Sequence, residues 1–175
     1  RHASHLLGLY PGNAITDKTP ELIEACKVSL LDRGFGQKSG ANGSGWGKAN
    51  KVNLWARAKD GNRAYSMLRE LINKNIAPNL WDFHPPYQMD GNCGYTSGVC
   101  EMLCYSSDDI IELLPALPEE WKNGSVKGLC ARGGYSLDFT WENGEIKSLS
   151  VYSSCGKKTA RIKTGDEIKT VKTVG

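Results

Sequence analysis

The chain has 175 residues, of which 39% are apolar and 23% are charged, and its formal net charge is +3. A chain of this length buries roughly two thirds of its unfolded surface, which is enough for a hydrophobic core. This composition excludes collagen-like, fully disordered and membrane-spanning classes. Charges of both signs are interspersed along the sequence, so neither nucleic acid nor a membrane is an expected partner.

The first helical pattern begins after the opening segment. Residues 19–21 (Thr-Pro-Glu) combine a hydroxyl cap, a proline suited to the first helical position and an acid favoured by the helix dipole. Leu22, Cys26 and Leu30 then recur every four residues. The pattern predicts a helix that ends at Gly34.

Three further helices are predicted before residue 106. One spans 46–59, and the next begins directly after Asp60-Gly61, so the pair should form an antiparallel helical hairpin. The last should run from about residue 92 to 105. Its first turns carry Gly94 and Gly98, which would let a neighbouring backbone approach closely.

The pattern changes to short β-rich runs after Ser106. Glycine-containing turns separate these runs, and Asn143-Gly144 predicts a hairpin because this pair supplies the positive φ angles of a type I′ turn. The sequence therefore predicts an α+β chain with helices over 1–106 and an antiparallel β domain over 107–175. The predicted strands lie within 110–117, 125–132, 135–141, 146–152 and 159–174.

Two polar segments are candidates for chemistry. His2 and His5 are spaced as on one helical face, but a metal site is not expected because only His84 remains as a third imidazole. Pro85-Pro86 holds the second segment extended, which places His84 and Asp90 on a stiff connection to the fourth helix. Asp90 could cap this helix, and that role is compatible with its facing a cavity.

A third segment, the glycine-rich loop over 34–47, lacks the spacing of a phosphate-binding loop and is interpreted as a rim loop. Trp46, Asn50 and Asn53 follow it. An indole beside amides suits a sugar ring, which needs both an apolar surface and hydrogen-bonding groups. Trp55 belongs to the same run, but core packing explains it equally well.

Six cysteines occur at irregular spacing without a CxxC pair, and we interpret them as mostly reduced, buried apolar residues. Cys93, Cys100 and Cys104 would share a helical face. Packing explains them better than a thiolate metal site, which would need a fourth ligand. No metal or other cofactor is expected.

Four ordered blocks resemble glycoside hydrolase family 95, the inverting 1,2-α-L-fucosidases. The resemblance covers about residues 1–155, and its most specific parts are HPPYQMDGN and LLPALPEEW. The blocks are RHASHLLGLYPGNAIT, GWGKANKVNLWARAKDGNRAY, NLWDFHPPYQMDGNCGYTSGVCEMLCYS and IIELLPALPEEWKNGSVKGLCARGGYSLDFTW.

The resemblance implies a fold and a site. Residues 1–106 would supply the last helices of an (α/α)6 toroid, and 107–175 a sandwich-like β domain. Asp90 matches the aspartate that supports a water-activating asparagine, and Arg1, His2 and His84 match residues that contact the sugar. The general acid and that asparagine belong to earlier segments of the family, so the chain alone is expected to be inactive.

The sequence also departs from the family pattern. Gly47 stands where serine is expected, Asn50 where an aromatic residue is common, and Cys93 where phenylalanine is common. These departures leave L-galactose open as an alternative to fucose.

A non-catalytic carbohydrate-binding or assembly module is a second alternative. In that case the aromatic residues of the β domain would hold the ligand, although aromatic residues that alternate on strands usually form core. These residues are Tyr135, Phe139, Trp141 and Tyr152.

The expected partners are a fucosylated oligosaccharide and the upstream remainder of the same protein. A partial toroid exposes apolar helix faces, which favour self-association into a homo-oligomer. The cues for the cellular compartment conflict, because the family suggests secretion and unpaired cysteines suggest a reducing interior.

Overall fold

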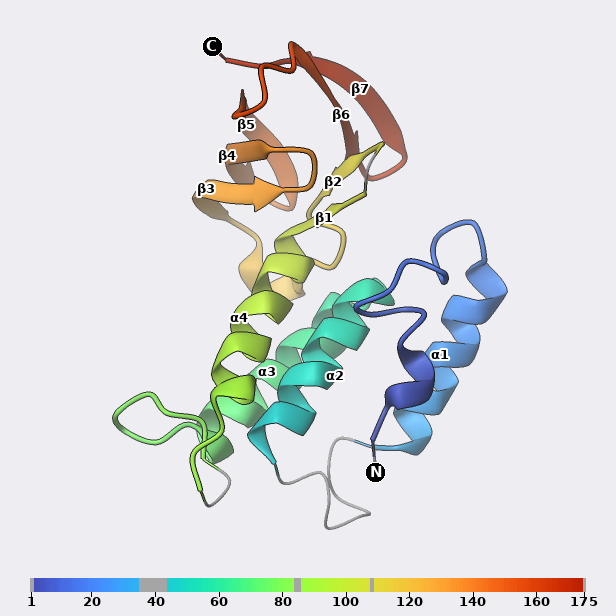
Figure 1. The fold of residues 1–175 in the computed structure, drawn as a ribbon, viewed down its shortest axis with the longest axis vertical. Helices are drawn as coiled ribbons and strands as arrows, with labels where there is room; N and C mark the ends of the chain where they lie inside the picture. Colours follow the sequence, from blue (N-terminus) through green and yellow to red (C-terminus); the bar gives the residue numbers. More distant parts are fainter. Residues whose placement is uncertain (1, 35–43, 84–85, 108, 175) are drawn as a thin grey trace.

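The computed structural model describes residues 2–34, 44–83, 86–107 and 109–174. A helical part leads into a β part, as Figure 1 shows, and this order confirms the predicted α+β class. A short 3₁₀ helix, Ser4–Leu6, precedes the four α-helices. These helices are α1 (Pro20–Asp32), α2 (Gly45–Arg57), α3 (Gly61–Asn75) and α4 (Met89–Leu103).

Helix α1 begins at Pro20, as predicted, but its buried face differs from the predicted stripe. Ile23, Cys26 and Leu30 are buried, whereas Leu22 is 43% exposed. The prediction for Leu22 was wrong because a strict spacing of four residues drifts around a helix that has 3.6 residues per turn.

Helix α4 begins three residues before the predicted start. Its N-cap is Gln88, and Asp90 therefore lies in the first helical turn rather than at the cap. The last predicted residues, Cys104 and Tyr105, belong to a strand instead.

Helix α2 lies at the centre of the helical part and packs against α3 and α4 (Figure 1). A Cβ atom at Gly94 of α4 would lie 2.9 Å from the Cβ of Ala49, and one at Gly98 would lie 2.5 Å from Val52 Cγ1. The predicted close approach at both glycines is confirmed. The fully buried Trp55 and Leu54 of α2 contribute to the same core, so packing accounts for Trp55.

The β part contains two sheets. One has three antiparallel strands, and its Asn143-Gly144 turn has positive φ at both residues, as a type I′ turn requires. The other has the order β1-β2-β6-β7, in which β2 and β6 are parallel, so the predicted antiparallel domain contains one parallel pair. The strands are β1 (Cys104–Ser106), β2 (Ile111–Leu113), β3 (Gly124–Ala131), β4 (Tyr135–Glu142), β5 (Glu145–Ser153), β6 (Thr159–Thr164) and β7 (Glu167–Lys172).

The inner faces of the strands form a second core. Phe139 and Trp141 are buried with their ring centroids 5.8 Å apart, as expected for aromatic residues that alternate on a strand, whereas Tyr152 is partly exposed. The Trp141 indole also donates a hydrogen bond of 2.7 Å to the Trp121 carbonyl.

All six cysteines are free thiols, but only Cys26 is buried, so the expectation of mostly buried cysteines was wrong. Cys93, Cys130 and Cys155 are exposed. Cys104 lies where α4 meets β1, and burial raises the pKa of its thiol to about 12, with the Glu101 carboxylate acting in the same direction. This thiol is a poor nucleophile near neutral pH.

Candidate functional site

A pocket of about 310 Å³ opens between the N-terminal segment and the N-terminal halves of α2 and α4. The imidazole of His2 stacks on the Trp46 indole, with ring centroids 5.4 Å apart and an interplanar angle of 21°. One wall therefore offers a flat aromatic surface, and the remaining lining combines apolar residues with polar ones. The lining residues are His2, Ala3, Ser4, Leu7, Tyr10, Pro11, Trp46, Asn50, Asn53, Asp90 and Gly94.

A chain of hydrogen bonds fixes the floor of this pocket. The hydroxyl groups of Tyr10 and Ser97 lie 2.9 Å apart, and Ser97 donates to Asn53 Oδ1 over 3.0 Å. The Asn53 amide donates to the carbonyl oxygens of Ala49 and Gly94, over 2.9 and 2.8 Å. The floor thus joins the N-terminal segment, α2 and α4 through a buried amide whose hydrogen bonds are satisfied.

Asp90 projects from the first turn of α4 and is exposed at the pocket. Within the described residues, no hydrogen bond or ion pair engages its carboxylate. The pocket therefore holds a carboxylate that is available to another molecule or another part of the protein.

Of the four predicted site residues, the structure brings His2 and Asp90 to one pocket. Arg1 and His84 lie outside the described residues, as does most of the predicted rim loop. His5, the other N-terminal imidazole, points elsewhere, because its Nε2 lies 2.7 Å from the Ser29 hydroxyl on α1. In the described part of the chain, no three His, Cys, Asp or Glu side chains are grouped so as to hold a metal ion.

Sequence reasoning missed a fully buried carboxylate, Asp82, beside this pocket. It also missed two buried lysines of α2. Lys48 donates to Asn75 Oδ1 over 2.8 Å, and Lys51 donates to the Gly34 carbonyl over 2.8 Å near the C-terminal end of α1. Burial lowers the pKa of Lys51. A charged residue at a buried helical position carries no local signal in the sequence.

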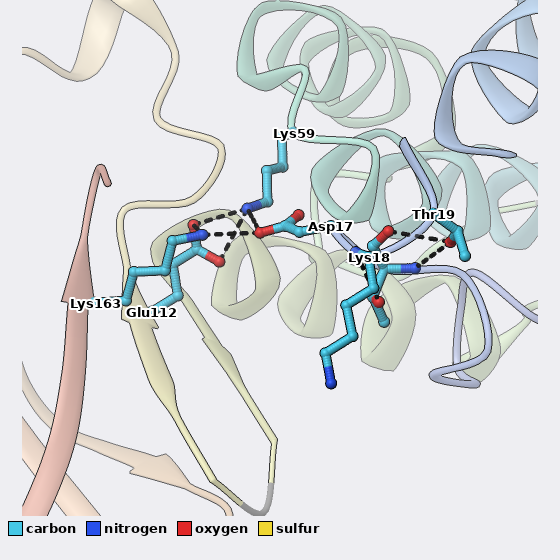
Figure 2. Close-up of polar contacts among 7 residues, drawn as sticks. Asp17, Lys18, Thr19, Lys59, Glu112 and Lys163 are labelled. Atoms are coloured by element: carbon cyan, nitrogen blue, oxygen red, sulfur yellow. Dashed lines mark hydrogen bonds and ion pairs between the residues drawn. The ribbon is translucent and has the colours of Figure 1, made fainter. Parts of the chain in front are cut away.

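A separate charged cluster joins the helical part to the β part, as Figure 2 shows. Lys59, after α2, contacts Asp17 at 2.6 Å and Glu112 of β2 at 2.8 Å. Lys163 of β6 contacts the same two carboxylates at 2.8 and 3.2 Å. Two cations and two anions therefore neutralise one another, which makes this cluster a structural junction.

Within this junction cluster (Asp17, Lys59, Glu112 and Lys163), the neighbouring charges shift the pKa values of Asp17 and Lys163. Burial alone would raise the pKa of Asp17, but hydrogen bonds from Lys163 and Lys59 lower it overall. Burial alone would lower the pKa of Lys163, but Asp17 and Glu112 raise it overall. Both groups are therefore charged over the whole physiological range.

Comparison with known proteins agrees with this architecture. The model of the glycosyl hydrolase family 95 catalytic domain matches residues 1–103, and that of the family 95 C-terminal domain matches residues 105–174. In the described part of the chain, no helix is both long and apolar enough to cross a membrane.

Three relatives extend the comparison. "Alpha-L-fucosidase 2" of Arabidopsis thaliana is 37% identical over 87% of this chain and 19% of its own length. "Probable alpha-fucosidase A" is 34% identical in Aspergillus oryzae and 32% in Aspergillus niger, over 82% and 93% of this chain and 22% and 23% of the relatives. The chain thus spans about a fifth of the length of these curated relatives.

Helices that lead into a two-sheet β domain, with matches to both parts, define a glycoside hydrolase architecture. The chain belongs to glycoside hydrolase family 95.

Proposed function

We propose that the chain is the C-terminal part of an exo-acting, inverting α-L-fucosidase that removes terminal α-1,2-linked fucose from glycans. The observation that carries this proposal is the pocket in which the Asp90 carboxylate and the His2–Trp46 stack lie together. Residues 1–106 would end the catalytic (α/α)6 domain, and residues 107–175 would form the C-terminal domain. The ranges of the two family matches support this division.

The size and lining of the pocket suit a single sugar. Its volume of about 310 Å³ lies at the lower end of small-ligand sites, which run from roughly 300 to 1,000 Å³. The Trp46 ring can pack against the apolar face of a pyranose, and Asn50 can hydrogen-bond its hydroxyl groups. In this proposal His2, Arg1 and His84 also contact the sugar, and fucosylated oligosaccharides are the substrates.

In this mechanism Asp90 acts through an asparagine from an upstream segment. An amide is too weak a base to take a proton from water unaided. An ionised carboxylate at hydrogen-bonding distance polarises the amide and stabilises the positive charge that develops in the transition state. The Asp90 carboxylate is suited to this task because the described residues leave its oxygens available.

The upstream part of the protein would also complete the surface around this pocket. Beside the pocket, the loop before α4 and the start of α4 expose a cluster of large apolar side chains, and the Trp81 and Tyr87 rings lie 4.7 Å apart. An exposed apolar cluster of this kind indicates a binding surface. In this proposal the upstream helices cover it and supply the general acid. The cluster consists of Leu80, Trp81, Phe83, Tyr87 and Met89.

The test compares this chain alone with the same chain joined to the upstream part of its protein. The joined protein should release fucose from an α-1,2-fucosyl galactoside, and proton NMR should show β-L-fucose as the first product, because the configuration inverts. The chain alone should be inactive, since loss of general acid catalysis alone costs roughly 10²–10⁴-fold in rate.

Three outcomes would contradict parts of this proposal. Fucose release by the chain alone would refute the need for the upstream acid. Initial release of α-L-fucose would refute inversion. Preferential hydrolysis of an α-L-galactoside would replace fucose as the substrate.

A further inference from the structure

Asp82 lies on the loop between α3 and α4, and it is a fully buried aspartate that the proposed mechanism does not use. We propose that Asp82 is a positioning residue that fixes the N-terminal ends of α2 and α4 relative to each other. It thereby sets the place of Asp90 within the pocket. This inference rests on the proposed function for its catalytic consequence, but not for its structural basis.

Two glycines show where the Asp82 carboxylate lies. A Cβ atom at Gly45, the first residue of α2, would lie 1.5 Å from Asp82 Oδ1. A Cβ atom at Gly91, in the first turn of α4, would lie 1.7 Å from Asp82 Oδ2. Each oxygen therefore rests directly against the backbone of a different helix, and any side chain at either glycine would displace it.

This position has an electrostatic basis. The first N–H groups of a helix have no partner within the helix, and the N-terminus carries a partial positive charge. A carboxylate placed against two such ends interacts favourably with both at once. Burial of an anion is costly in general, and proximity to two helix N-termini would offset part of that cost.

The backbone around Asp82 is held in place from three sides. Its N–H donates to Asn92 Oδ1 of α4 over 2.8 Å, and its carbonyl accepts from the Gln88 N–H over 3.2 Å. The Asn92 amide donates to the Leu80 carbonyl over 2.8 Å, and the Phe83 N–H donates to the Asn75 carbonyl. The carboxylate is thus attached to a backbone that hydrogen bonds hold to α3 and to the start of α4.

The contacts of Asp82 with α2 and α4 affect the whole pocket. Helix α2 carries Trp46, Asn50 and Asn53, and α4 carries Asp90 and Gly94. Because Asp82 contacts the first turns of both helices, its loss should change the distance between the His2–Trp46 stack and the Asp90 carboxylate. Misplacement of a reacting group by about 1 Å can cost on the order of 10²-fold in rate.

Amide hydrogen exchange on this chain tests whether Asp82 fixes the N-terminal ends of α2 and α4. The experiment compares Asp82→Asn with Asp60→Asn. Asp60 accepts from the Arg63 N–H and caps α3 alone, so it is the matched control. Asp82→Asn should speed exchange by roughly 3- to 10-fold at both 45–51 and 89–95. Asp60→Asn should speed it in α3 only. A change at one helix, or at neither, in Asp82→Asn would overturn the proposal.

If Asp82→Asn does not fold, Gly91→Ala tests the same contact between the Asp82 carboxylate and the two helices. The added methyl group lies on α4 and displaces the Asp82 carboxylate without removing it. We expect faster exchange at the start of α2 as well, because the displaced group also contacts Gly45. Faster exchange confined to α4 would overturn the bridging role.

The effect of Asp82 on turnover is tested in the protein that includes the upstream segment. Asp82→Asn should lower kcat about 10²-fold and change KM less than threefold, whereas Asp60→Asn, compared at matched thermal stability, should keep the kcat of the unsubstituted enzyme. An equal, small effect of both variants would reduce Asp82 to a purely structural role. If the unsubstituted enzyme does not cleave fucosides, the proposed function fails, while the exchange result still decides the bridging role.

Discussion

The two ends of the α2–α4 pair differ in how their charges are satisfied. At the C-terminal end, the junction cluster pairs two lysines with two carboxylates from distant segments. At the N-terminal end, the Asp90 carboxylate has no partner within the described residues, and the neighbouring apolar cluster is exposed. Charges are therefore neutralised where the chain meets itself, and they stay available where another molecule or segment is expected.

The largest stability effect should come from the junction cluster. Glu112→Ala removes a carboxylate that is 8% exposed and leaves Lys59 and Lys163 without one of their two anions. Breaking a buried ion pair costs about 3–5 kcal/mol, and the partial exposure of both lysines reduces this to about 2–3 kcal/mol. Urea unfolding measures the loss.

Lys147→Gln is the matched control, because its pairing with Glu145 is fully solvent-exposed, and its unfolding midpoint should not change. Equal midpoints for Glu112→Ala and the unsubstituted chain would show that the junction is not a stabilising element.

A smaller effect is expected where α2 and α4 pack together. In Gly98→Ala the new methyl group would lie 2.5 Å from Val52 Cγ1, and overpacking of this kind costs about 1–3 kcal/mol. The double variant with Val52→Ala should recover part of the loss, which a double-mutant cycle measures by thermal unfolding. Additive losses in the double variant would contradict direct contact at this position.

The flat aromatic surface that His2 and Trp46 form should affect substrate binding more than turnover. Trp46→Ala in the protein with its upstream part should raise KM roughly 3- to 10-fold, because aromatic stacking contributes about 0.5–1.5 kcal/mol. Trp121→Ala, remote from this pocket, should leave KM unchanged in the folded enzyme. A KM unaffected by Trp46→Ala would remove the stacking wall from the proposed sugar site.

The smallest effect is expected on the stability of the chain at acidic pH. The pKa of Asp17 is lower in the folded chain than in the unfolded chain, so its contribution to stability is present above about pH 4 and is lost as pH falls through the folded value. Asp17→Asn should therefore flatten the acid side of the stability curve slightly. An unchanged dependence of the unfolding midpoint between pH 2 and 5 would contradict the lowered pKa.

Local chemistry made much of the fold predictable. Pro20 marked the start of α1, the Asn143-Gly144 pair marked a hairpin, and Gly94 and Gly98 marked a close helix contact. Each of these signals acts within a few residues, where backbone geometry and periodicity decide the structure.

Long-range features could not be predicted in the same way. The parallel pairing of β2 with β6 and the Lys163–Asp17 contact, which spans 146 residues, depend on the tertiary fold. Asp82 looks like an ordinary loop aspartate until Gly45 and Gly91 are seen against its carboxylate. His2 and Asp90 were identified through the family motifs, and only the structure places them at one pocket.

The proposed role of Asp90 is decided by the turnover of Asp90→Asn in the protein that includes its upstream part. We expect kcat on an α-1,2-fucoside to fall by about 10²–10⁴-fold, because a neutral amide cannot stabilise the charge that develops on the water-activating group. Asp32→Asn, at an exposed position on α1, should leave kcat unchanged. If Asp90→Asn turns over the fucoside as fast as the unsubstituted enzyme, Asp90 has no part in the reaction.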